Sequence, residues 1–181
     1  MQMTTDPEST LFLSHMAEQE KTKNNRIPGV RTVLIVLSSA GMVFDVEALR
    51  QKVLLSYPDA AVFFLTTLGK PIGSPPPAHV DLLVDFTGPR QRQGFLFAKK
   101  LRRMARVTVG RNAGLFRMKV YDRVFDEKAK AAELNSEVLV RERQVQKEVL
   151  ALAGVAFVPA GDAAPDRGKL TPMESPPYSK L

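Results

Sequence analysis

The sequence lacks cysteine altogether and has only two histidines among its 181 residues. The absence of cysteine excludes disulfide bonds and thiolate metal sites. His15 and His79 lie far apart, in stretches without an apolar period. We therefore expect neither a histidine metal site nor a histidine-based catalytic dyad, and the function we predict needs no metal ion and no cofactor.

Long apolar runs are also missing. None approaches the roughly 20 residues that a membrane-spanning helix needs. The N-terminus has no basic stretch leading into a sustained apolar segment, so we expect no signal peptide. These absences favour a cytoplasmic protein, with a peripheral position on the inner membrane surface as an alternative.

Acidic residues are in the minority, with 19 Asp and Glu against 26 Lys and Arg, and the net charge is +7. A basic chain favours phosphate-bearing partners, such as nucleic acid, anionic lipid headgroups or phosphorylated sugars and nucleotides. An ordinary solvated basic surface is the alternative. The apolar fraction of 44% is typical of a soluble globular protein, and the length predicts one domain with tails.

The composition divides the chain into three parts. Residues 1–29 are polar and predict a flexible arm, which could also order on a partner. Residues 30–158 carry the apolar patterns of a folded domain. Residues 159–181 contain five prolines and no apolar period, which predicts an extended or disordered tail.

The fold class follows from short apolar runs that alternate with helical patterns. Five consecutive apolar residues from Val33 to Leu37 predict a strand buried on both faces. Asp45 is suited to cap a helix that Pro58 ends. The expected order is strand 33–37, helix 45–57, strand 61–67, proline-rich linker 68–78, strand 80–86, helix 90–104 and strand 106–109. This order predicts an α/β fold with an open, mainly parallel, Rossmann-like sheet and helices on both faces.

The later part of the domain is less regular. Residues 110–125 fit an amphipathic helix or a mixture of helix and loop. Ser136 is suited to cap a helix that runs to about Ala153, and Gly154 is suited to its C-terminal cap. A last short strand is expected over 156–158. The apolar face of the late helix is predicted to comprise Val138, Val145, Val149 and Leu152.

Two loops at the carboxyl ends of predicted strands are candidate binding sites. Ser38, Ser39 and Gly41 form a small-residue turn before a helix start, where backbone N–H groups can bind a phosphate or carboxylate. The turn is neither a dinucleotide-binding fingerprint nor a Walker loop, and a tight connection is the alternative. If the strands 33–37 and 80–86 are neighbours, the second loop approaches this turn. That loop contributes Asp85, Thr87, Gly88 and Arg90.

A third candidate site is a block of positive charge. Between Arg90 and Arg123 lie eleven basic residues and a single acid, Asp122. Such a block predicts salt-sensitive binding to polyanions. The basic patch is expected to include Lys99, Lys100, Arg102, Arg103, Arg106, Arg111, Arg117 and Lys119.

The chain resembles the N-terminal, acceptor-side domain of the heptosyltransferase-like glycosyltransferases, family 9. Residues 33–67 match the family's first strand, its small-residue S-S-x-G turn, the following helix and the PDA turn into the second strand. Asp85 and Gly88 match its D-x-x-x-D-x-x-G segment, and Glu142-Arg143 matches the ER pair of a late helix. The resemblance spans about residues 31–158. It implies half of a GT-B architecture whose acceptor is a phosphorylated lipid–sugar core.

Two departures from the family's pattern bear on catalysis. The family's acid after the turn glycine, taken as its general base, falls on Met42, and a thioether cannot accept a hydroxyl proton at neutral pH. The chain also ends where the donor domain is expected. We therefore predict a degenerate, non-catalytic binding or scaffold subunit that docks through a basic face and its extended tails to a protein complex or to an anionic partner.

Two alternatives remain open. The first is the acceptor-binding half of a split glycosyltransferase acting on a phosphorylated, lipopolysaccharide-type glycolipid, with Asp45 or Asp85 as the base. The second is a nucleic-acid-binding protein.

Overall fold

The computed structural model describes Glu20, Thr22 and residues 24–37, 45–87, 92–112, 119–127, 129–134 and 136–156, with the backbone alone at 92–95 and at residue 112. Most of the predicted arm and the whole predicted tail lie outside these residues. So does the expected strand over 156–158, apart from Ala156, which is not part of a strand.

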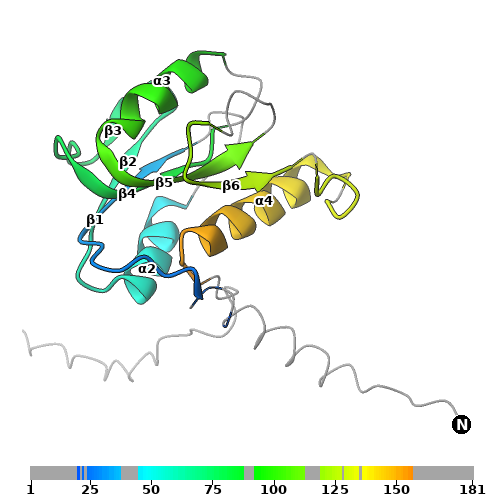
Figure 1. Ribbon diagram of the computed structural model, residues 1–181, viewed down its shortest axis with the longest axis horizontal. Coiled ribbons are helices and arrows are strands. Elements are labelled where there is room, and N and C mark those ends of the chain that lie inside the picture. The colour runs from blue at the N-terminus through cyan, green and yellow to red at the C-terminus, as the bar shows by residue number, and fades with distance from the viewer. Residues whose placement is uncertain are drawn as a thin grey trace, which may run out of the picture.

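The described residues form a six-stranded sheet with helices on both faces (Figure 1). The strand order is β3-β2-β1-β4-β5-β6, and every pairing is parallel except that of β3 with β2 at one edge. This is the open, mainly parallel, Rossmann-like α/β fold expected from the sequence. The strands are β1 Thr32–Val36, β2 Ala61–Leu65, β3 Pro71–Ile72, β4 Val80–Asp85, β5 Ala105–Asn112 and β6 Arg123–Asp126, and the helices are α2 Val46–Ser56, α3 Arg92–Arg102 and α4 Val138–Leu152.

β1 lies at the centre of the sheet, between β2 and β4. Val36 pairs with Leu65 on one side and with Asp85 on the other. The strand over 33–37 and the strand over 80–86 are therefore neighbours, which is the condition stated above for their two loops to approach each other. The chain leaves β1 toward β2 and later crosses to β4 on the opposite side, which places a topological switch point at their carboxyl ends.

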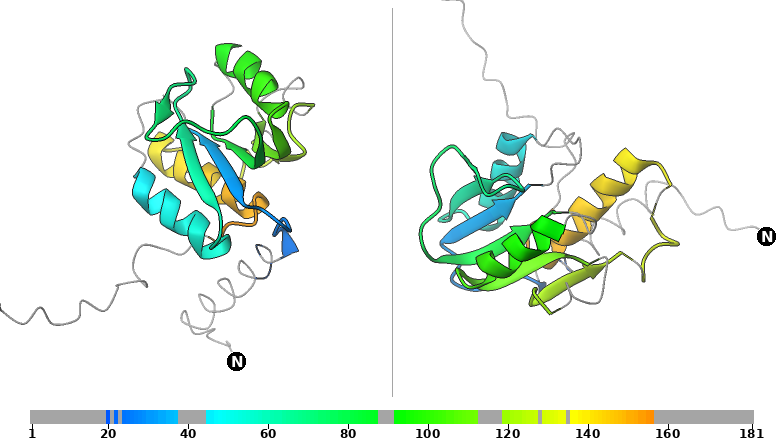
Figure 2. Two further views of the ribbon diagram at one scale, coloured as in Figure 1. Left: turned by 90° about the vertical axis from the view of Figure 1, so that its left-hand side faces the viewer. Right: turned by 90° about the horizontal axis from the view of Figure 1, so that it is seen from above.

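Alternate residues of each strand pack on opposite faces of the sheet, because successive side chains of a strand point in opposite directions. Val33 and Ile35 belong to the core beneath α2 and α4, whereas Leu34 and Val36 belong to the core beneath α3. Figures 1 and 2 show α3 on one side of the sheet, with α2 and α4 on the other. This double coverage explains the continuous apolar runs in the strands.

α2 begins and ends where the sequence predicts. The carboxylate of Asp45 accepts a hydrogen bond of 2.9 Å from the backbone N–H of Ala48, so Asp45 is the N-cap. Leu49 and Val53 are buried against the sheet. The helix ends at Ser56, shortly before Pro58.

Two short strands differ from the sequence predictions. β3 lies inside the segment predicted as a linker, and its two residues pair only at the sheet edge. β6 begins inside the segment 110–125, for which a helix was one option, and β5 continues to Asn112 rather than ending at Val109. The carboxylate of Asp122 fixes the start of β6, because it accepts bonds of 2.8 Å from the backbone N–H and the hydroxyl of Thr108 in β5.

The start of α4 also differs from the prediction. Its N-cap is Glu137 rather than Ser136, and the Glu137 side chain forms no capping hydrogen bond. Val138, predicted on the apolar face, is 71% exposed, and the first buried residue of α4 is Val145. Val149 is buried as expected. Gly154 follows the helix with a φ of +72°, which confirms the predicted glycine cap.

The last residues of the predicted arm belong to the folded domain. Ile27 is part of the hydrophobic core. Its backbone N–H donates to the hydroxyl of Tyr57 at 3.1 Å, and that hydroxyl donates to the carbonyl oxygen of Ala153 at 2.7 Å. Burial raises the pKa of Tyr57, although the hydrogen bond from Ile27 and the charges of Arg123 and Arg26 oppose the rise. The phenol therefore stays protonated and joins the N-terminal segment to the end of α4.

Candidate functional site

The carboxyl edge of the sheet is where an open α/β sheet binds its ligands. Asp85 and Thr87 lie at this edge, next to the end of β1, as the sequence predicts. The other residues predicted there lie outside the described residues, so the anion-binding turn stays a prediction. These are Ser38, Ser39, Gly41, Met42, Gly88 and Arg90.

Asp85 is buried and has structural partners. It is 1% exposed. Its Oδ2 accepts a hydrogen bond of 2.5 Å from the Tyr121 hydroxyl, and its Oδ1 accepts one of 2.7 Å from the backbone N–H of Thr87. The side chain therefore holds the chain after β4 in place and joins it to the segment before β6. A carboxylate buried in this way is poorly placed to take a proton from an acceptor hydroxyl.

Gly110 makes the contact between Asp85 and Tyr121 geometrically feasible. The Tyr121 ring lies directly over this glycine, and a Cβ at residue 110 would lie 2.6 Å from two ring carbons. Any side chain at residue 110 would push the ring away from Asp85. Sequence reasoning missed Tyr121, because it precedes β6 in a stretch that offered no clear pattern.

Arg111 is buried, so it is not part of a basic surface and its predicted place in the patch is wrong. It is 4% exposed and lies between β5, the end of β6 and α4. Its guanidinium contacts Glu127 at 2.5 Å and Glu142 at 2.5 and 2.9 Å. Burial alone would lower the pKa of Arg111, but the bonds to Glu142 and Glu127 outweigh it and raise the pKa. Arg141 lies 3.7 Å from Glu127 at the half-exposed rim.

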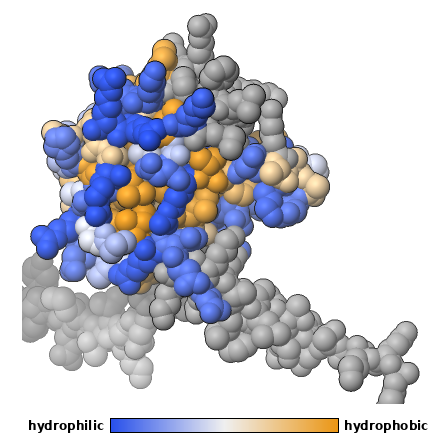
Figure 3. Space-filling model, viewed as in Figure 1, coloured by the Kyte–Doolittle hydropathy of each residue, from blue (hydrophilic) through white to orange (hydrophobic). Residues whose placement is uncertain are grey.

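Four other residues of the predicted patch are exposed, and within the described residues they form no salt bridge. We call Lys99, Lys100, Arg103 and Lys119 the basic face. The first three belong to α3 or the turn after it. Lys119 lies beside them, because its carbonyl oxygen accepts a hydrogen bond from Arg102. Figure 3 shows hydrophilic side chains gathered over α3, in the upper part of the molecule.

Two further patch residues are only partly available, and one is not described. Arg102 lies 3.7 Å from Asp122, with both side chains almost half exposed. Arg106 lies 3.7 Å from Asp81 and donates to the carbonyl oxygen of Pro28 at 2.8 Å. Arg117 lies outside the described residues.

Two acids on this part of the chain, Asp81 and Asp85, are hydrogen-bonded within the fold. Between Asp59 and Asp122 the sequence contains only two, Asp81 and Asp85. The Asp81 carboxylate accepts hydrogen bonds from the backbone N–H of Arg31 and from the N–H and hydroxyl of Thr32. The bond from Arg31 is the main cause that lowers the pKa of Asp81. Both acids are thus bonded within the fold. An exposed acid, Asp122, does lie beside the basic face, 3.7 Å from Arg102.

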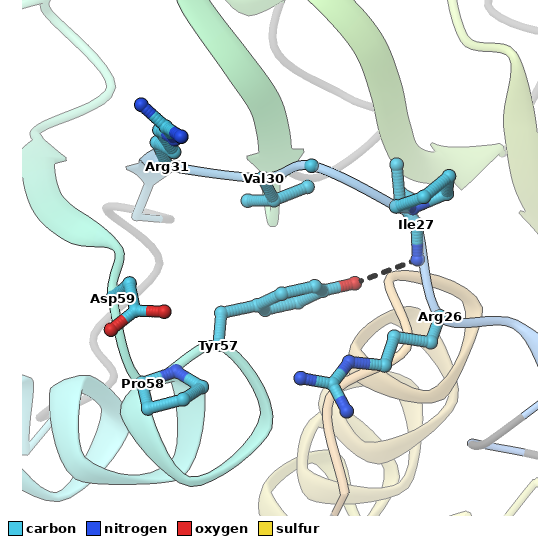
Figure 4. A pocket seen from close by; sticks show the side chains of 9 residues that line it. Arg26, Ile27, Val30, Arg31, Tyr57, Pro58 and Asp59 are labelled. Carbon is cyan, nitrogen blue, oxygen red and sulfur yellow. Dashed lines mark hydrogen bonds between the residues drawn. The ribbon is translucent and has the colours of Figure 1, made fainter.

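Two pockets lie at the opposite, amino-terminal edge of the sheet. The larger is about 360 Å³ and is shown in Figure 4, where Arg26 lies beside the Tyr57 ring and Arg31 lies on the side of Asp59. The second pocket is about 310 Å³, and its lining includes His79, Arg103 and Arg106. Sequence reasoning missed Tyr57 and Arg31, because no local pattern places them at a pocket.

Comparison with protein-family models, with curated proteins and with solved structures finds no match to this chain. Within the described part of the chain, no group of acidic or histidine side chains could hold a metal ion. In the same part, no helix is long and apolar enough to cross a membrane.

Proposed function

We propose that this chain is a non-catalytic, glycosyltransferase-like binding or scaffold subunit that docks on an anionic partner through its basic face. The observation that carries the proposal is the separation of charge around α3. Lys99, Lys100 and Arg103 are exposed, whereas Asp81 and Asp85 are bonded within the fold and Asp122 is paired with Arg102. A surface of unpaired cations attracts anions at long range and binds them in a salt-sensitive way.

The described acids support the non-catalytic part of the proposal. Asp45 accepts the capping bond of α2, and Asp85 is buried beneath Tyr121. Met42 occupies the position of the family's general base in the resemblance described above, and it cannot take a proton. None of these three groups is both free and basic, as a glycosyltransferase base has to be.

A heparin column tests the docking surface, since heparin is a flexible polyanion. Lys100→Glu on α3 and Arg143→Glu on α4 each lower the net charge by two, and both residues are exposed. We expect Lys100→Glu to elute at clearly lower salt than the wild type, and Arg143→Glu to elute much closer to it. Equal shifts would mean that net charge alone drives binding, which contradicts a basic face on α3.

The acceptor-binding half of a split glycosyltransferase is the second candidate, favoured by Asp85 and Thr87 at the switch point between β1 and β4. It predicts sugar transfer from a nucleotide-sugar when the chain is mixed with a separate donor domain, and loss of that transfer in Asp85→Asn. Transfer in this mixture would overturn the non-catalytic proposal. A nucleic-acid-binding protein is a third reading, and it requires binding to DNA or RNA near physiological salt.

A further inference from the structure

The outward side of α3 carries one apolar residue in line with its basic ones. Leu96, Lys99, Lys100 and Arg103 recur at i, i+3, i+4 and i+7, so the first three share one face of α3, and Arg103 follows them in the turn after the helix. Ala98 and Leu101 occupy the opposite face and are buried against the sheet. Leu96 is 63% exposed. We call these four outward residues the α3 stripe.

A second exposed leucine lies close to α3. Leu68, in the connection between β2 and β3, is 73% exposed. The next residue, Gly69, lies so close to α3 that a Cβ there would be 2.8 Å from the ring of Phe97. Lys70 is exposed in the same connection, and residues 66–80 contain no acid. Two exposed leucines are thus set among cations on one side of the sheet.

The other side of the sheet has a different character. α2, α4 and the turns next to them carry exposed acids among their basic residues, among them Glu47, Asp59 and Glu137. The molecule is therefore mainly basic on the α3 side and of mixed charge on the α2 and α4 side, and exposed apolar side chains occur on both sides. Figures 1 and 2 show these two sides of the sheet, with α3 on one and α2 and α4 on the other. This asymmetry suits a flat anionic surface better than an anionic partner that surrounds the protein.

We infer that the α3 stripe, with Leu68, docks on the surface of an anionic lipid bilayer. Leucine side chains enter the boundary between headgroups and acyl chains, while lysine and arginine remain at the level of the lipid phosphates. The inference rests on the proposed function, because it names the anionic partner of the same basic face.

Exposed leucines favour lipid over nucleic acid as the partner. Single-stranded nucleic acid binds by stacking its bases on exposed aromatic rings. Contacts with its phosphate groups do not remove an exposed leucine side chain from water. Every aromatic side chain that the structure describes is buried or partly buried, including Phe97 on α3. Apolar side chains surrounded by lysine and arginine are instead typical of membrane-surface helices.

Vesicle binding of the full chain tests the inference. We expect cosedimentation with an equimolar mixture of phosphatidylcholine and phosphatidylglycerol and none with phosphatidylcholine alone. Leu68→Ser with Leu96→Ser should weaken binding to the mixed vesicles at least about tenfold, because two apolar side chains lose their place in the interface. Leu55→Ser is the matched control, since Leu55 is 67% exposed on α2, across the sheet, and this variant should bind as the wild type does.

A fluorescence measurement separates insertion from charge attraction. The chain contains no tryptophan, so a single Leu96→Trp substitution supplies a unique probe. Its emission should shift to shorter wavelength on the mixed vesicles, and that of Leu55→Trp should not. An unshifted Leu96→Trp emission, or wild-type binding by the double serine variant, would overturn the inference.

The remaining outcomes distinguish this inference from the proposed function. Binding to heparin, RNA or an acidic protein without binding to the mixed vesicles would overturn membrane docking and leave an anionic partner for the basic face. Failure to bind any of these polyanions would overturn both.

Discussion

Replacing Arg111 with methionine removes the one cation that two buried carboxylates share. Glu127 is almost as buried as Arg111, and Glu142 is about four-fifths buried. For charge centres about 4 Å apart at an effective dielectric constant of about 20, each pair attracts by about 4 kcal/mol. Desolvation of the three groups offsets much of this attraction in the folded protein. Without Arg111, only the half-exposed Arg141 remains near Glu127, and the desolvation of the two carboxylates is largely uncompensated. We therefore expect Arg111→Met to lower the free energy of unfolding by about 3–5 kcal/mol.

Removing all three charges together should be far less damaging. Arg111→Met combined with Glu127→Leu and Glu142→Leu leaves no unpaired buried charge, and apolar side chains of similar size can pack against the buried Val145 of α4. We expect this triple variant to lose less than about 2 kcal/mol relative to the wild type. The Arg111→Met effect should persist at high salt, because buried charges are poorly screened.

Equilibrium unfolding in urea of the full chain measures these differences. Arg143→Met is the control, since Arg143 is exposed on α4 and forms no salt bridge among the described residues, and its effect should stay within about 0.5 kcal/mol. A loss below about 1 kcal/mol for Arg111→Met would refute the buried ion cluster. A triple variant as unstable as Arg111→Met would refute the argument that the uncompensated charge is the cause.

Other substitutions test the remaining contacts. Gly110→Ala should cost about 1–3 kcal/mol by displacing the Tyr121 ring, and most of this cost should vanish in a Tyr121→Ala background, as a double-mutant cycle in urea would show. Gly154→Ala should cost about 2 kcal/mol or more, because the added Cβ meets a positive φ and a backbone atom 2.6 Å away; unchanged thermal stability would contradict this. Asp45→Ala should lower stability by about 1 kcal/mol through loss of the α2 cap, measured by urea unfolding. The pKa of Asp81 is lowered in the fold, so its carboxylate stabilises the protein above the ordinary pKa of 3.8 and ceases to do so as pH falls through the folded value. The stability difference between wild type and Asp81→Asn should therefore be constant near neutral pH and shrink in acid; a difference that grows in acid would contradict the sign.

The site residues that the sequence predicted are those whose position follows from residues close to them in the chain. Asp85 and Thr87 were placed at the carboxyl edge because they follow a run of apolar residues that forms β4. Their partner Tyr121 could not be found in this way, since it reaches Asp85 from 36 positions further along the chain. The basic block was evident in the sequence, but the exposure of its members was not: Lys100 is exposed and Arg111 is buried, although both are cations of the same block.

The sequence by itself determined the regular elements that have a strong local period. β1, β2, β4, α2 and α3 were predicted because each buries a repeated pattern of side chains, and the fold class followed from their order. Only the tertiary structure decided where β3 and β6 lie, which acids are bonded within the sheet, and that Arg111 pairs with Glu127 and Glu142. Short strands gain their hydrogen bonds from a neighbouring strand, and the burial of a charge depends on residues distant in the sequence. Neither feature can therefore be predicted from a local sequence pattern.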